Sequence, residues 1–100
     1  GIVILVESPG NVWKLEENGI HNSVALFGAN LTDRQKTILD MSGAMTIMTI
    51  MDNDEAGHKA AKIIQDKCSR TYNIKNITVS KNDIAEMTTD EINKEIKRFL

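Results

Sequence analysis

Residues 44–57 read AMTIMTIMDNDEAG, an uncharged, mostly apolar run that ends abruptly in acids. The run from Ala44 to Met51 is the most apolar of the chain and predicts a strand buried on both faces of a sheet. Asp52 and Asp54 follow, and at this spacing an extended segment points both side chains the same way. Neighbouring carboxylates repel unless a cation lies between them, and oxygen-rich clusters suit Mg²⁺ or Mn²⁺. The alternative is an acidic turn that caps the next helix.

Short apolar runs and amphipathic segments alternate on both sides of this stretch, which is the pattern of a parallel sheet covered by helices. Strands are expected at residues 2–6, 23–27, 44–51 and 74–79. Helices are expected from Pro9 to the Asn18-Gly19 C-cap, after the Thr32 capping box, at residues 56–68, and after Thr88 with a stripe of Ile92, Ile96, Phe99 and Leu100. We therefore predict an α/β, Rossmann-like fold: a four-stranded, mainly parallel sheet with helices on both faces.

Composition sets the broad class of the protein. Residues 1–100 suffice for a single domain, and Gly1 directly before a strand suggests a piece excised from a longer protein. The formal net charge of -2 provides no global basic field for nucleic acid. The single cysteine, Cys68, fits a reducing, cytoplasmic setting, and the apolar runs are too short to involve a membrane. Trp13 and the methionines are expected in the core.

Acidic residues follow three of the four expected strands. Glu7 comes directly after the first strand, Asp52 and Asp54 after the third, and Asp83 after the fourth. Ligands in open α/β sheets bind outside the carboxyl ends of the strands. We therefore predict a divalent-metal site at this edge of the sheet.

Several segments also carry a family resemblance. They are residues 6–9 (VESP), 19–28 (GIHNSVALFG), 31–32 (LT), 52–57 (DNDEAG) and 81–86 (KNDIAE). Together they resemble the Toprim domain, more narrowly the version found in bacterial and phage DNA primases and primase-helicases. The resemblance extends from about Val3 to about Glu86.

The resemblance implies an activity and a set of site residues. The implied function is Mg²⁺- or Mn²⁺-dependent nucleotidyl transfer, in which a primase joins ribonucleotides into an RNA primer on single-stranded DNA. Glu7, Asp52 and Asp54 would be the catalytic residues. The metal ligands would be Glu7, Asp52, Asp54 and Asp83. Lys81 and Asn11 are expected to contact phosphate or nucleotide. In a full-length protein the partners would be template DNA and ribonucleotides, with a replicative helicase as a further candidate.

The chain departs from the usual primase pattern at three positions. Ser8 replaces a glycine, Asn11 replaces an acid near the start of the first helix, and Ala85 replaces the second acid of the last motif. Two other functions stay open: a small Toprim nuclease, and a non-catalytic nucleic-acid-binding module that has kept the fold. The flanking coding sequence would discriminate between them, because primases need an upstream template-binding subdomain.

Overall fold

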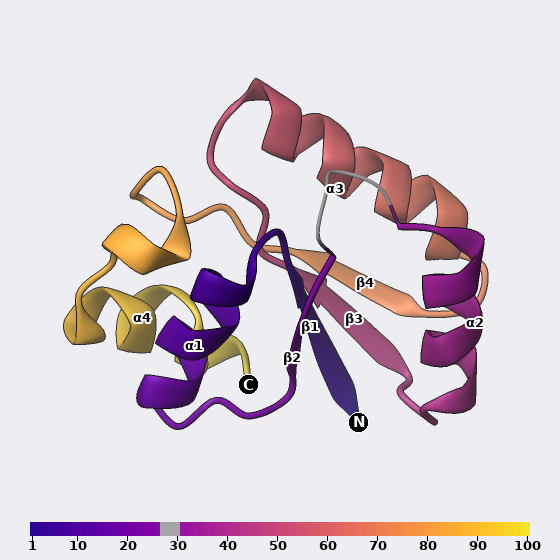
Figure 1. The fold of residues 1–100 in the computed structure, drawn as a ribbon, viewed down its shortest axis with the longest axis horizontal. Coiled ribbons are helices and arrows are strands. Elements are labelled where there is room, and N and C mark those ends of the chain that lie inside the picture. The colour runs from indigo at the N-terminus through magenta and orange to yellow at the C-terminus, as the bar shows by residue number, and fades with distance from the viewer. Residues whose placement is uncertain (27–30) are drawn as a thin grey trace.

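Four strands form one parallel sheet in the order β2-β1-β3-β4 in a computed structural model that describes residues 1–26 and 31–100. The strands are β1 (Ile2–Val6), β2 (Ser23–Ala25), β3 (Thr46–Thr49) and β4 (Asn73–Asn76). The helices are α1 (Pro9–Glu17), α2 (Asp33–Met41), α3 (Glu55–Cys68) and α4 (Thr89–Glu95), with 3-10 turns η1 (Ile84–Glu86) and η2 (Lys97–Phe99) (Figure 1). In the register of the sheet, Ile4 lies beside Ser23 of β2 and Met48 of β3.

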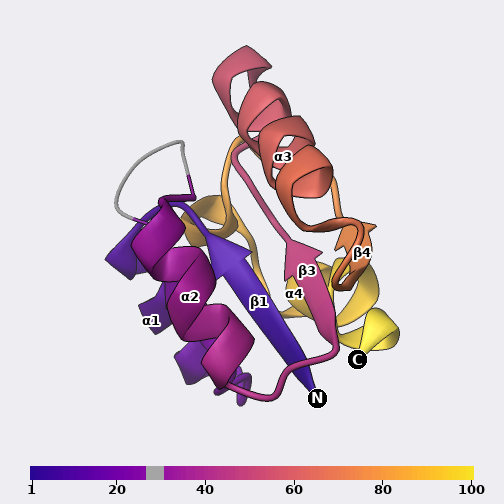
Figure 2. The ribbon, with the colours of Figure 1, turned by 90° about the vertical axis from the view of Figure 1, so that its right-hand side faces the viewer.

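Each face of the sheet has its own apolar core, because side chains alternate along a strand. Ile4 and Met48 face α1, η1 and α4, whereas Leu5 and Ile47 face α2 and α3. Figures 1 and 2 show these two helical layers on opposite sides of the sheet. The central strands β1 and β3 are therefore covered on both faces, as their apolar sequences require. The predicted α/β fold, with a parallel four-stranded sheet and helices on both faces, is confirmed.

Local signals at the helix ends are also confirmed. Thr32 and Thr88 each form a capping box, with Gln35 and Glu91 respectively. Gly19 has φ of 81°, the left-handed conformation that ends α1. Among the helices in the described ranges, none has the length and apolar character needed to cross a membrane.

The ends of several strands differ from the sequence-based bounds. The third strand, expected at 44–51, pairs only over Thr46–Thr49, and the fourth pairs over Asn73–Asn76 instead of 74–79. β2 ends at Ala25, and the predicted end of this strand at Phe27 and Gly28 lies outside the described residues. The apolar run continues past β3 because Ile50, whose N–H donates to the Leu5 carbonyl at 2.9 Å, is still buried in the core.

Some apolar residues expected in the core are exposed. The Trp13 side chain is 69% exposed, so its assignment to the core is wrong. The buried positions of α1 are Asn11 and Leu15, one turn apart, and this turns Trp13 toward solvent. Met41 and Met45 are exposed as well, whereas the other methionines are buried. The stripe expected after Thr88 also ends early, since α4 stops at Glu95 and Phe99 and Leu100 are partly exposed.

Candidate active site at the carboxyl edge of the sheet

All of the predicted acids lie at the carboxyl edge of the sheet. Glu7 directly follows β1, Asp52 and Asp54 lie between β3 and α3, and Asp83 lies between β4 and η1. The turns after β1, β3 and β4 lie at the same edge of the sheet in Figure 1. Because β1 and β3 are neighbours, the turn that carries Glu7 lies next to the turn that carries Asp52.

Glu7 and Asp52 form a carboxyl pair. Burial raises the pKa of Glu7 to about 7, helped by a hydrogen bond to the Asp52 side chain and by the charges of Asp52 and Asp54. A hydrogen bond to the Asp52 backbone acts in the opposite direction but does not cancel these effects. Two carboxyl groups can share a hydrogen bond only if one of them carries a proton. The pair therefore shares a proton near neutral pH, and no described lysine, arginine or histidine lies within ion-pair distance of either group.

The acidic segment after β3 is a turn. The Asp54 N–H donates to the Asp52 carbonyl at 2.9 Å, so the chain bends at Asn53 and does not continue the strand as expected. Asp54 is the N-cap of α3, where its Oδ1 accepts a hydrogen bond from the Gly57 N–H at 2.7 Å. The two aspartates thus differ in their contacts: Asp52 interacts with Glu7, and Asp54 caps the helix.

Gly57 allows α3 to approach the Asp52 peptide closely. A Cβ atom at this position would lie 1.9 Å from the Asp52 carbonyl oxygen and 2.8 Å from its carbon. No side chain fits at that distance, so the glycine is required by packing. Gly57 is part of the motif that resembles the family, but the sequence does not explain why a glycine is needed there. The explanation is the close packing of α3 against the Asp52 peptide.

Asn53 joins the two loops of the site, a role that the sequence did not reveal. Its backbone N–H donates to the Asn82 carbonyl at 2.6 Å, and its Nδ2 donates to the Val79 carbonyl at 2.9 Å. Its Oδ1 lies 3.1 Å from Nε2 of His58. The turn after β3 is therefore fixed to the segment after β4. The only sequence signal was the polar residue between two aspartates, which does not say which loop it contacts.

The remaining predicted site residues have other contacts. Asp83 is the N-cap of η1 and accepts a hydrogen bond from the Glu86 N–H at 3.2 Å. Lys81 Nζ lies 3.8 Å from the Glu91 carboxylate, and Asn11 is buried in the first turn of α1. Among the described residues, none of the three forms a hydrogen bond or ion pair with Glu7 or Asp52. Their roles at the site stay predictions.

The donor set suits a hard divalent cation with water ligands. Within residues 1–26 and 31–100, no three His, Cys, Asp or Glu side chains are arranged to hold one metal ion. Glu7 and Asp52 nevertheless offer paired oxygen ligands, with no described cation within ion-pair distance of either. Mg²⁺ typically binds through one or two carboxylates and keeps several waters. The residues present therefore fit Mg²⁺ or Mn²⁺, but not a fully protein-made cage.

Known proteins support the resemblance found in the sequence. The Toprim domain family matches residues 1–80. A DNA primase from Chlamydia pneumoniae is 33% identical over 66 residues, which cover 66% of this chain and 11% of that protein. The crystal structure of the Aquifex aeolicus primase, comprising zinc-binding and RNA polymerase domains, matches with a TM-score of 0.70 and 28% identity, over 99% of this chain and 24% of that one.

The RNA polymerase domain of the Mycobacterium tuberculosis primase has the same fold, with a TM-score of 0.77 at 16% identity, over 97% of this chain and 35% of that one. The chain thus spans only 11% of the curated primase and 24–35% of the solved chains. The identification from sequence is confirmed. The chain belongs to the Toprim domain family and is similar to the corresponding domains of DNA primases.

Proposed function

We propose that this domain carries the metal-dependent nucleotidyl-transfer centre of a DNA primase. The observation that carries the proposal is the Glu7–Asp52 carboxyl pair, placed where the two central strands end in a Toprim chain similar to primases. In a longer protein, the domain would join ribonucleotides into an RNA primer on single-stranded DNA, in the cytoplasm and with a replicative helicase as a candidate partner.

The chemistry of phosphoryl transfer assigns a task to each residue. Bound Mg²⁺ or Mn²⁺ would neutralise charge on the phosphate oxygens and lower the pKa of an attacking hydroxyl. Asp52 would hold the ion, and Glu7 would be either a second ligand or the group that accepts the proton of the attacking hydroxyl. Asp54 and Asp83 would add oxygen ligands or position water. Both would then combine this task with capping a helix.

Nucleotide binding is assigned to Lys81 and Asn11. Lys81 is half-exposed and would exchange its contact with Glu91 for a triphosphate. Asn11 lies in the first turn of α1, directly after the turn that contains Glu7. Because its side chain is buried, its amide would contact only a nucleotide atom that comes directly against this turn.

Metal binding by the 100-residue chain tests the site. Mn²⁺ binding followed by water proton relaxation should weaken at least tenfold in Glu7→Gln and in Asp52→Asn. Asp66→Asn is the matched control, since it removes an exposed acid from α3, far along the helix from the N-terminal turn. Equal binding by all four proteins would refute the metal site.

The non-catalytic alternative has a specific observation in its favour: Asp54, Asp83 and Lys81 each already have a structural partner. Primer synthesis by the full-length parent on single-stranded DNA separates the two functions. The proposal expects Glu7→Gln to lose most primer synthesis while template binding persists. A parent that binds template but makes no primer before any substitution would favour the non-catalytic module.

A further inference from the structure

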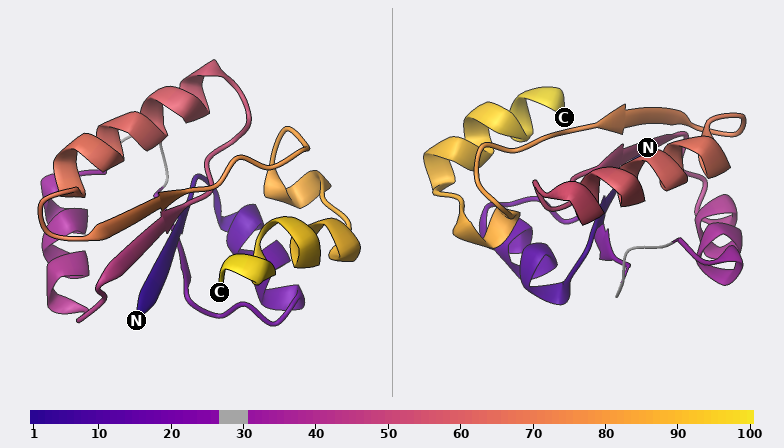
Figure 3. Two further views of the ribbon diagram at one scale, coloured as in Figure 1. Left: turned by 180° about the vertical axis from the view of Figure 1, so that it is seen from behind. Right: turned by 90° about the horizontal axis from the view of Figure 1, so that it is seen from above.

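The outer edge of β4 is an open strand edge. β4 pairs only with β3, and Asn73 and Ile77 donate their N–H groups to carbonyls of β3 or its flanking residues. Because backbone groups alternate along a strand, the N–H and C=O groups of Ile74 and Asn76 point away from the sheet. Among residues 1–26 and 31–100, no hydrogen bond reaches these outward groups. Figure 3 shows β4 at the margin of the molecule, with α3 on one side and α4 on the other.

Grooves flank this edge on both faces of the sheet. One groove, of about 320 Å³, lies toward α4 and η2 and is lined by Ile77, Lys94, Arg98 and Phe99. The other, of about 500 Å³, lies toward α3 and is lined by Ala61, Lys62, Gln65 and Asp66. Asn76 and Thr78 belong to both. An added strand would pair with the edge and send alternate side chains into the two grooves.

The charges around the edge are mainly positive, although the whole chain is slightly negative. Lys62, Lys75, Lys94 and Arg98 form no ion pair with any described residue. Glu95, which lines the α4 groove, already accepts hydrogen bonds from the Ser80 N–H at 2.6 Å and hydroxyl at 2.7 Å. Both Glu95 and Asp66 remain charged, so the four basic side chains face two acids among the groove residues of the described part of the chain. The edge is therefore complementary to acidic side chains.

Backbone chemistry distinguishes the candidate occupants. A strand edge offers carbonyl oxygens as well as N–H groups, and a phosphate backbone, which only accepts hydrogen bonds, would meet repulsive carbonyls. A peptide strand has both donors and acceptors. A second copy of this chain would bring its own lysines and arginine to the same edge, which is the usual way that proteins prevent edge-to-edge pairing.

We propose that the outer edge of β4 binds an extended, acidic segment of a partner protein by adding it as a fifth strand. Backbone hydrogen bonds to Ile74 and Asn76 supply the affinity, and acidic side chains that meet Lys62 on one face and Lys94 or Arg98 on the other supply the selectivity. This site is separate from the Glu7–Asp52 pair and does not depend on catalysis.

A labelled ten-residue peptide of alternating Glu and Thr tests the proposal by fluorescence anisotropy. The same peptide N-methylated at alternate residues should bind at least tenfold more weakly, because it lacks donors for the edge. A version with Lys in place of Glu and a ten-nucleotide oligo(dT) should also bind at least tenfold more weakly.

Matched variants of the protein give the second arm. Asn76→Pro removes the outward N–H and should weaken peptide binding at least tenfold. Asn76→Ala loses the same side-chain contacts with Thr49 and Gln65 but keeps the N–H, and should retain binding. Arg98→Glu should weaken binding at least fivefold, and Arg34→Glu on α2 by less than twofold. Three results would overturn the proposal. They are peptide binding that N-methylation does not weaken, tighter binding of oligo(dT) than of the peptide, and a dimer in sedimentation experiments that Asn76→Pro converts to monomer.

Discussion

Two groups of acids in this chain lie in opposite electrostatic environments. On α2, Asp40 accepts hydrogen bonds from the Tyr72 hydroxyl at 2.6 Å and from Lys36 Nζ at 3.2 Å. The Tyr72 hydroxyl, with Lys36, holds the pKa of Asp40 below its usual value. At the carboxyl edge of the sheet, the Glu7–Asp52 pair has no cation within ion-pair distance among the described residues, and the pKa of Glu7 is raised.

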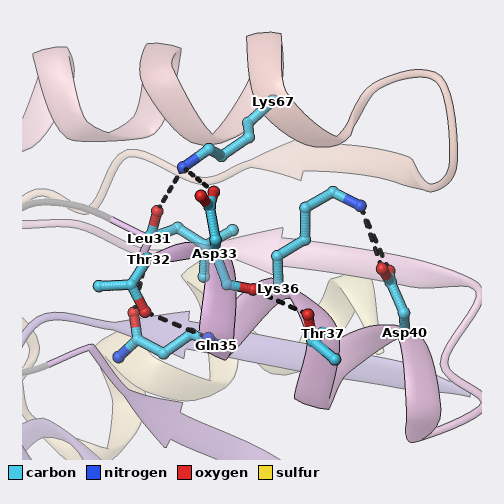
Figure 4. Close-up of polar contacts among 8 residues, drawn as sticks. All are labelled: Leu31, Thr32, Asp33, Gln35, Lys36, Thr37, Asp40 and Lys67. Carbon is cyan, nitrogen blue, oxygen red and sulfur yellow. Dashed lines mark hydrogen bonds and ion pairs between the residues drawn. The ribbon is translucent and has the colours of Figure 1, made fainter.

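The α2 region pairs most of its charges: Asp33, Lys36 and Asp40 have partners, whereas Arg34 forms no ion pair with any described residue. Lys67 of α3 donates to the Leu31 carbonyl at 2.8 Å and lies 3.3 Å from Asp33 (Figure 4). Lys36 extends toward Asp40 one turn further along α2. The hydrogen bond of Lys67 joins α3 to the start of α2, and Lys36 and Asp40 neutralise each other within the helix. A carboxyl group whose pKa is raised by burial and by neighbouring acids, as Glu7 is at the other site, is instead typical of a functional site.

Among the substitutions that would test the contrast between the Glu7–Asp52 pair and the α2 region, Gly57→Ala should have the largest effect. The new Cβ would collide with the Asp52 carbonyl at 1.9 Å, so the turn must move, at a cost of about 3 kcal/mol in the free energy of unfolding. Displacing Asp52 should also return the pKa of Glu7 toward its ordinary value. Urea unfolding and NMR titration of the Glu7 carboxyl measure the two effects.

Gly10→Ala is the matched control for that substitution. Gly10 also lies in the first turn of a helix, but the nearest atom to an added Cβ would be the Ser8 hydroxyl at 3.8 Å, so stability should hold or rise. Equal stability of the two variants would contradict the close approach of α3 to Asp52.

Asn53→Ala should have the next largest effect. It leaves the buried Val79 carbonyl without its donor and frees the turn from the segment after β4, which should cost about 2 kcal/mol. Mn²⁺ affinity should fall as well, although Asn53 is not an expected ligand. Asn93→Ala, at an exposed site on α4, should change neither property. Full Mn²⁺ affinity in Asn53→Ala would show that the contacts of Asn53 do not position the acids.

Glu7 should make stability depend on pH in a direction opposite to that of most carboxylates. Its folded-state pKa, about 7, exceeds the ordinary 4.5, so the folded state binds the proton more tightly. Without metal, stability should fall as pH rises from about 4.5 to 7, by about 1 kcal/mol after allowance for solvent screening. Glu7→Gln should flatten this dependence, and Mg²⁺ should oppose the fall. A stability that rises through this window in both proteins would contradict the carboxyl pair.

Much of the architecture followed from local patterns. The apolar run of residues 2–6 and the Thr32 and Thr88 capping boxes depend on nearest neighbours, so their structures were predictable. The burial of Trp13 was predicted wrongly because it depends on which side of α1 packs against the sheet. The sequence of α1 is compatible with more than one buried side.

The site was predictable in location but less so in contacts. That Glu7, Asp52 and Asp83 lie at one edge follows from the parallel direction of the strands that precede them. The assignment of Asp54 to the α3 cap, of Lys81 to Glu91 and of Asn53 to two loop carbonyls depends on distances between loops, which hydrophobic periodicity does not specify.

The smallest expected effect is at the exposed start of α2. Asp33 is almost fully in water, with a side chain 98% exposed, so Asp33→Asn should leave the free energy of unfolding unchanged within error, in low and high salt. Lys67→Met should cost about 1 kcal/mol, because it removes the partly buried hydrogen bond to the Leu31 carbonyl while keeping the apolar stem. The contrary result would be an equal loss of unfolding free energy in the two variants at low salt, and an equal recovery at high salt. In that case the ion pair between Lys67 and Asp33, and not the hydrogen bond to the Leu31 carbonyl, would fasten α3 to the start of α2.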